Sequence, residues 1–241
     1  MYSTPFSPAE ARSARARVGL STAQVAQAMT ACGAPVRPEL IEAWEYGTQA
    51  PTESQLFVLA DVLWCPPTAL MGVEPRTLAE HRMARQLSVE RLAQLIGMDP
   101  AMYWAAESAQ QWNGDYRQTK ALVEALGLSL RKLIGVMGHD EELAGHLRSA
   151  IDGRWKAQVG AIAKITTLNK TRVSDALRTM HAEFAEFSER YMGHVVARND
   201  DSRLKEVAAE RSAYLRRLVD RFWDLIGDAG EAPPFNSVPT H

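Results

Sequence analysis

The sequence is poor in cysteine: Cys32 and Cys65 are the only two among 241 residues, and neither has neighbours at the spacing of a metal site. Two cysteines cannot form a disulfide framework, so we expect reduced thiols and no bound metal. No apolar run reaches the roughly 18 residues of a transmembrane helix, and the first residues lack the charged-then-apolar pattern of a signal peptide. These absences predict a cytoplasmic protein with no membrane partner.

Common catalytic motifs are also missing from the chain. The sequence contains no GxxxxGK, no GxGxxG after a strand, no HExxH and no GxSxG. The six histidines are scattered along the sequence instead of forming a local pair. We therefore predict that the protein is not an enzyme and uses no cofactor.

Positive charge is local in this sequence. The formal net charge is -2, so the general excess of basic residues found in many DNA-binding domains is absent. Residues 148–178, however, contain seven positively charged side chains and only two negatively charged ones, Asp152 and Asp175. Such a segment fits either a phosphate-binding surface or a solvated helix face, and the sequence leaves both readings open.

Residues 19–73 have the apolar spacing of several short helices. Ser21 stands at a helix start, and Val25 and Met29 then fall on one face. Pro38 begins the next helix, which Gly47 ends. Pro51-Thr52 then precedes a third apolar run, from 56 to 63. The spacing predicts a helix-turn-helix with a supporting helix.

This stretch resembles the phage-repressor (Cro/cI, or XRE) family of helix-turn-helix regulators over about 60 residues. The matching residues are Leu20, Ser21, Val25, Ala26, Ile41, Trp44, Glu45 and Gly47, with Arg15 in the preceding helix. The resemblance implies that double-stranded DNA is contacted by Arg15, Thr22, Arg37, Glu39, Glu42 and Thr52. Two of these are carboxylates, which repel phosphate, so a helical bundle or a protein-binding use of the same shape stays open.

A diverged second copy follows the first. Leu87-Ser88 repeats Leu20-Ser21 at an offset of 67, and Ile134-Gly135-Val136 repeats Met71-Gly72-Val73 at an offset of 63. The difference places about four extra residues in the first copy, in the turn at 31–36. In the second copy, the positions that would face a DNA groove are Ala101, Met102, Trp104 and Ala105. These side chains cannot hydrogen-bond base edges, so Met102 and Trp104 favour a protein partner over DNA.

Residues 159–180 predict a further helix-turn-helix, with its turn at 167–169. The segment resembles the helix-turn-helix core of winged-helix regulators such as the MarR and GntR families, although no wing sequence follows it. The resemblance implies DNA contacts by Asn169, Lys170, Thr171, Arg172, Ser174 and Arg178, whose donors suit phosphates and guanine edges. The alternative is a basic, solvated helix in a bundle.

Two long helices are predicted before the C-terminus. Their apolar stripe is close to a heptad repeat, which is typical of dimerisation. The predicted interface consists of Phe184, Phe187, Tyr191, Leu215, Leu218 and Phe222. The alternative is that these helices pack only within their own chain.

Together these patterns predict an all-α fold: tandem lambda-repressor-like domains at 1–74 and 75–138, a helical domain at 139–227 and a flexible tail at 228–241. The predicted function is that of a sequence-specific DNA-binding transcriptional regulator acting as a homodimer. The alternative is an interaction module of helix-turn-helix shape that binds another regulator or a polymerase subunit.

Overall fold

A computed structural model describes residues 4–196 and 201–227, and every regular element in those ranges is helical, which confirms the all-α fold. The chain divides into two compact units, Met1–Asn113 and Gly114–His241. This division falls inside the predicted second repeat, and the limits 1–74, 75–138 and 139–227 stay predictions. The predicted tail, 228–241, lies outside the described residues. None of the described helices has the length and apolar character needed to cross a membrane.

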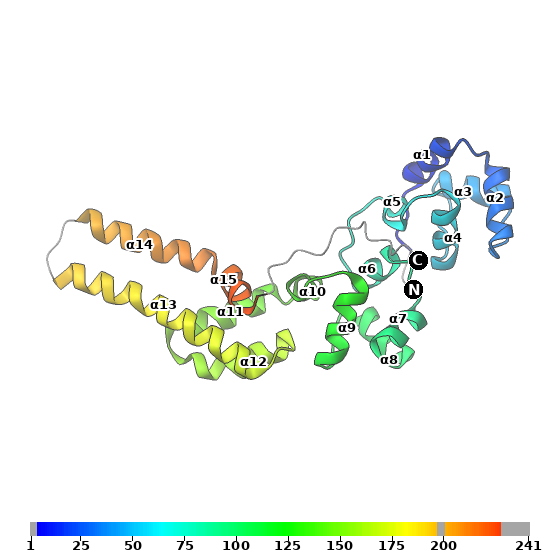
Figure 1. The fold of residues 1–241 in the computed structure, drawn as a ribbon. Coiled ribbons are helices and arrows are strands. Elements are labelled where there is room, and N and C mark those ends of the chain that lie inside the picture. The colour runs from blue at the N-terminus through cyan, green and yellow to red at the C-terminus, as the bar shows by residue number, and fades with distance from the viewer. Residues whose placement is uncertain (1–3, 197–200, 228–241) are drawn as a thin grey trace, which may run out of the picture. The chain divides into compact units, whose positions relative to one another are not determined.

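Five helices lie in the predicted first repeat: α1 Pro8–Val18, α2 Thr22–Ala31, α3 Pro38–Glu45, α4 Glu53–Val62 and α5 Pro67–Met71 (Figure 1). The expected helix starts are confirmed, because Ser21 and Thr52 cap α2 and α4 through their side chains. Pro38 is the first residue of α3, and Gly47 follows its end in the left-handed region, with φ of 74°. Side chains from all five helices meet in one core that includes Trp44.

Three further helices complete the first unit: α6 Leu78–Ala84, α7 Val89–Ile96 and α8 Pro100–Ala109. Gly97 ends α7 in the left-handed region, and the Asp99 side chain caps α8. Residues 97–99 thus form the turn that corresponds to residues 32–37 between α2 and α3. In addition, α2 has 10 residues and α7 has 8, so the extra length of the first repeat lies partly in the helix and partly in the turn.

The second unit contains α9 Tyr116–Leu126, α10 Leu130–Val136, α11 Asp140–Ser149, a π-helical turn Ala150–Arg154, α12 Trp155–Thr166, α13 Lys170–Val196, α14 Asp201–Arg216 and α15 Leu218–Ile226. Helices α9 and α10 were expected in the second repeat and belong to this unit. One core joins α10, α11, α12, α13 and α15, and the fully buried Leu147, Val173 and Phe222 are among its members.

Helices α13 and α14 run side by side as a long arm, drawn yellow and orange in Figure 1. Glu183 on α13 ties this arm to α15, because it accepts hydrogen bonds from Arg221 and, at 2.9 Å, from the Tyr214 hydroxyl. The Arg221 guanidinium lowers the pKa of Glu183, since it stabilises the carboxylate. One carboxylate therefore joins three helices.

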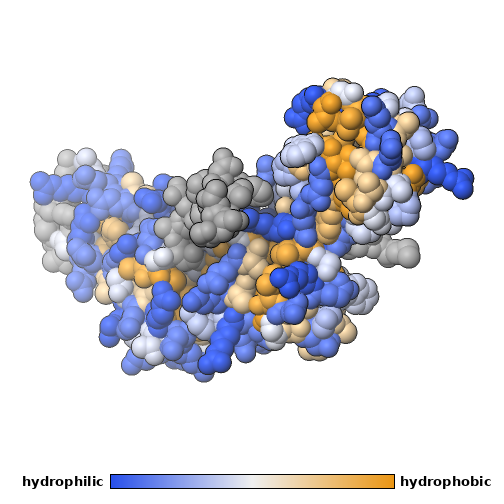
Figure 2. Space-filling view, turned by 45° about the vertical axis from the view of Figure 1, so that its right-hand side comes forward, coloured by the Kyte–Doolittle hydropathy of each residue, from blue (hydrophilic) through white to orange (hydrophobic). Residues whose placement is uncertain are grey.

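The predicted dimer interface needs correction. Phe184, Leu218 and Phe222 are 4%, 2% and 0% exposed, because they fill the core of their own chain. Phe187 and Leu215 pack against the same core. Tyr191, near the end of α13, stays 43% exposed. Hydrophilic side chains predominate on the face of the arm visible in Figure 2, as expected when the apolar stripe is covered within the chain.

Candidate nucleic-acid interface

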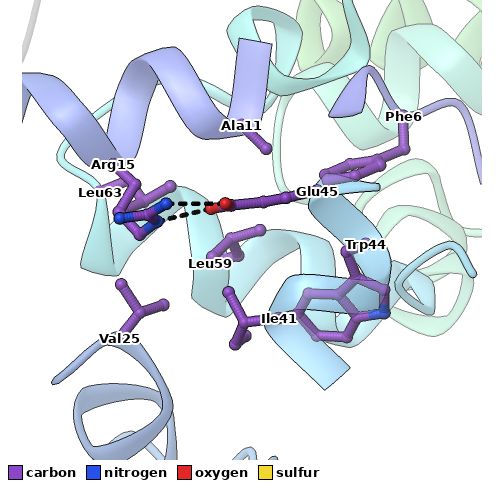
Figure 3. A pocket seen from close by; sticks show the side chains of 9 residues that line it. All are labelled: Phe6, Ala11, Arg15, Val25, Ile41, Trp44, Glu45, Leu59 and Leu63. Carbon is purple, nitrogen blue, oxygen red and sulfur yellow. Dashed lines mark hydrogen bonds and ion pairs between the residues drawn. The ribbon is translucent and has the colours of Figure 1, made fainter. Parts of the chain in front are cut away.

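Arg15 lies on α1, and its side chain points toward Glu45 at the end of α3. Its Nε and Nη2 donate to the two carboxylate oxygens of Glu45 at 2.6 and 2.7 Å, and its Nη1 donates to the Leu20 carbonyl at 2.9 Å. Figure 3 shows the paired hydrogen bonds of Arg15 and Glu45 above the apolar side chains of Val25, Ile41 and Leu59. The cavity that these residues line has a volume of about 10 Å³, which is far too small for a ligand. The structure therefore gives Arg15 a structural role in place of the DNA contact predicted for it.

The other residues predicted to read DNA from the first repeat do lie at its surface. Arg37, Glu39, Glu42 and Thr52 are exposed, and Thr22 is half-buried. The Thr22 hydroxyl donates to Glu42 at 3.2 Å, and Thr52 is occupied as the cap of α4. With Arg15 engaged, Arg37 is the one cation of this predicted set that faces solvent, against two carboxylates. The surface is therefore poorly matched to a phosphate backbone.

The corresponding helix of the second repeat, α8, exposes apolar side chains. Met102 and Trp104 are 65% and 60% exposed. Neither side chain offers the paired donors and acceptors that distinguish base pairs in the major groove. Large exposed apolar groups of this kind suit a protein contact.

Sequence reasoning missed Arg82, a nearly buried arginine on α6. Its side chain is 3% exposed, and all five of its guanidinium N–H groups are used. They donate to Glu107, to Glu53 and to the Leu87 carbonyl, at 2.6 to 2.9 Å. The signal was available: Arg82 follows Arg15 by the same offset of 67 that relates Leu87 to Leu20.

The third predicted surface is built on a tight turn between α12 and α13. Thr167 adopts the left-handed conformation with φ of 54°, which ends α12. Leu168 is 8% exposed and anchors the turn in the core. The Asn169 side chain then accepts from the Thr171 backbone N–H at 2.7 Å and so caps α13. A helix, a short turn and a second helix therefore lie at the predicted positions, with Asn169 acting as a cap.

The first turns of α13 present a mixed polar face. Lys170 and Thr171 are exposed, and Ser174 is half-buried. Arg178 is also exposed but lies 3.1 Å from Asp175 in an ion pair of two solvated side chains, which contributes little stability and leaves the guanidinium accessible. Val173 and Leu177 are buried in the core, so the opposite side of α13, which carries these polar residues, faces solvent.

Arg172 is held differently from its neighbours. Its Nη2 donates to the Ile226 carbonyl at 2.5 Å, near the end of α15. This bond joins the start of α13 to a segment 54 residues later in the chain. Arg172 therefore contributes one of its donors to the packing of the unit, and the base contact predicted for it stays a prediction.

Cations on the neighbouring elements extend the basic character of this region. Arg148 at the end of α11, Lys156 at the start of α12 and Lys164 near its end are all exposed. Lys156 lies 5.6 Å from the centre of the Trp155 ring. Within residues 148–178 the acidic residues are Asp152 and Asp175, whereas α11 begins with Asp140, Glu141 and Glu142 and the later part of α13 adds further glutamates. Residues 148–178 therefore carry a net positive charge that suits an anionic polymer.

No protein-family model, curated protein or solved structure matches this chain. The described residues also contain no group of histidine, cysteine and carboxylate side chains that could hold a metal ion. The α12–α13 surface offers ammonium, guanidinium and hydroxyl donors at the capped start of a long helix.

Proposed function

We propose that this protein is a DNA-binding transcriptional regulator whose reading element is the start of α13. The observation that carries the proposal is the capped α12–α13 turn, which fixes Lys170, Thr171 and Arg178 on the solvent side of a helix whose opposite side is in the core. Lysine and arginine neutralise phosphates, and arginine and threonine also contact base edges. Lys164, near the end of α12, supplies a further phosphate contact.

Fluorescence anisotropy tests this proposal directly. The full chain would be titrated onto a randomised duplex library from 50 to 300 mM salt, and the retained DNA sequenced. The expected result is an enriched site and a steep loss of affinity with salt, because bound phosphates release counterions. Arg178→Ala and Lys170→Ala should each lower the magnitude of the salt slope by about 0.9 if each contacts one phosphate.

Matched controls separate a reading surface from general charge. Arg91→Ala removes an exposed arginine from α7 and should leave the salt slope unchanged. Unchanged binding in both α13 variants, together with intact melting curves, would remove α13 from the interface. A two-fold symmetric site would in addition support the dimer predicted from the sequence.

A second candidate function is a protein-interaction module, and one observation favours it. Met102 and Trp104 are exposed on α8 at positions where a DNA-reading helix would carry polar groups. A regulator or polymerase subunit that buried Trp104 would gain a central aromatic contact. Pull-down with the wild type and with Trp104→Ala distinguishes the two functions, since loss of a stoichiometric partner with DNA binding intact assigns α8 to protein contact.

A further inference from the structure

A cavity of about 260 Å³ opens in the second unit, beside the α12–α13 turn. Its walls come from α9, from the α9–α10 loop, from the turn at Thr167-Leu168 and from the end of α15. Val123, Leu128 and Ile226 give it an apolar lining. The cavity is therefore a hollow within one compact unit, formed by segments far apart in the sequence.

The charged groups of the lining all have one sign. Lys120 and Arg172 line the cavity, and no aspartate or glutamate does. Lys120 is 64% exposed and lies 3.9 Å from Glu124, which is outside the lining, so this weak surface pair leaves its ammonium group available. In the described part of the chain, Arg172 has one hydrogen bond, to the Ile226 carbonyl. An arginine has five N–H donors, so several remain for a ligand.

The size and lining define a class of ligand. Pockets for drug-sized molecules measure about 300 to 1,000 Å³ and combine apolar walls with a few placed polar groups. This cavity lies just below that range and has apolar walls with two cations. A molecule that fits carries one carboxylate and a small apolar body, such as a single ring on a short chain.

We propose that this cavity binds a small organic carboxylate, with Lys120 and Arg172 holding its anionic group and Val123, Leu128 and Ile226 packing against its apolar body. Binding there engages Arg172 in the first turn of α13 and the Thr167-Leu168 turn that positions it. The binding itself does not depend on the proposed DNA function, because it can be measured without DNA.

Isothermal titration of the full chain with 3-phenylpropionate tests the proposal. The uncharged 3-phenylpropionamide supplies the same ring without the charge, and inorganic phosphate supplies charge without an apolar body. We expect saturable binding of the carboxylate, with binding of the amide and of phosphate at least tenfold weaker. Hexanoate, which has an apolar chain of similar volume, should bind more weakly than 3-phenylpropionate but measurably.

Variants locate the binding in the cavity. Lys120→Gln should weaken binding of 3-phenylpropionate at least tenfold, and Val123→Phe should abolish it by filling the space. Lys132→Gln removes an exposed cation from α10 in the same unit and should leave binding unchanged. Melting curves of each variant verify that the unit is folded.

Three results would overturn the proposal. These are the absence of saturable binding of either carboxylate up to 10 mM, equal affinity for the amide, and unchanged affinity in both Lys120→Gln and Val123→Phe. DNA binding is measured separately by anisotropy. Ligand binding without DNA binding would support the cavity as a carboxylate site and would contradict the proposed DNA-reading function of α13.

Discussion

Each of the two predicted repeats contains an arginine–glutamate ion pair, and the two arginines differ in exposure and in their number of partners. Arg15 meets Glu45 and the Leu20 carbonyl, and Arg82 meets Glu107 and the Leu87 carbonyl, in the same pattern. In the first repeat the arginine side chain is 23% exposed and has one carboxylate partner. In the second it is 3% exposed and also binds Glu53 on α4.

The additional partner gives the arginine of the second pair a further structural role. Glu53 belongs to the first repeat, so Arg82 joins α4 to α6 and α8 within the first unit. Burial would disfavour a charged arginine, but two carboxylates more than offset it and raise the pKa of Arg82. The N–H donors of Arg15 and Arg82 point toward carboxylates and carbonyls of the protein, so they are not directed at a DNA phosphate.

The largest expected effect comes from breaking the Arg82 cluster. Arg82→Met keeps the side-chain length but leaves Glu107 buried without its cation, which costs about 3–5 kcal/mol of unfolding free energy. The melting temperature should fall by about 10 °C or more. Circular dichroism measures the change, with Arg91→Met as the exposed control. A smaller shift than that of Arg15→Met would contradict the ranking of the two ion pairs.

The same substitution in the first repeat should cost less. Arg15→Met leaves Glu45 unpaired, but the arginine is partly exposed and water can reach the site, so we expect about 1–3 kcal/mol. The salt slope of DNA binding should not change, because the Arg15 side chain points toward Glu45. Arg12→Met, which removes an exposed arginine from the same helix, is the control. Unchanged melting with a lower slope would restore the predicted phosphate contact.

A further contrast lies at the ends of α4 and α9. Trp64 adopts φ of 51° and is 90% exposed, whereas Gly127, at the corresponding position of the second repeat, adopts φ of 62°. A left-handed conformation favours glycine over other residues by about 1 kcal/mol. Trp64→Gly should therefore stabilise the protein by up to about 1 kcal/mol, and Gly127→Ala should destabilise it by a similar amount. Melting changes of the same sign in both variants would contradict this reasoning.

Local features of the fold were predictable from sequence and distant ones were not. Ser21, Thr52 and Pro38 mark helix starts because capping involves residues within one turn. The partner of Arg15 is 30 residues away and that of Arg172 is 54 residues away, so neither contact leaves a local pattern. The stripe of Phe184 and Phe222 shows that a face is buried but does not show which surface covers it.

The smallest effect at neutral pH is expected for Tyr103. Its ring is fully buried, and burial, followed by the nearby Glu107 carboxylate, raises the pKa of its phenol above the ordinary value of 10. The unfolded chain then loses the phenol proton first, so the stabilising difference is fully present below pH 10 and is lost as pH rises toward the raised native pKa. Tyr103→Phe should change the melting temperature little at pH 7 and make the first unit less sensitive to pH between 10 and 11. Tyr116→Phe, at an exposed position, is the control and should not alter the alkaline profile. An identical alkaline loss of stability in Tyr103→Phe and the wild type would show that the buried phenol does not govern it.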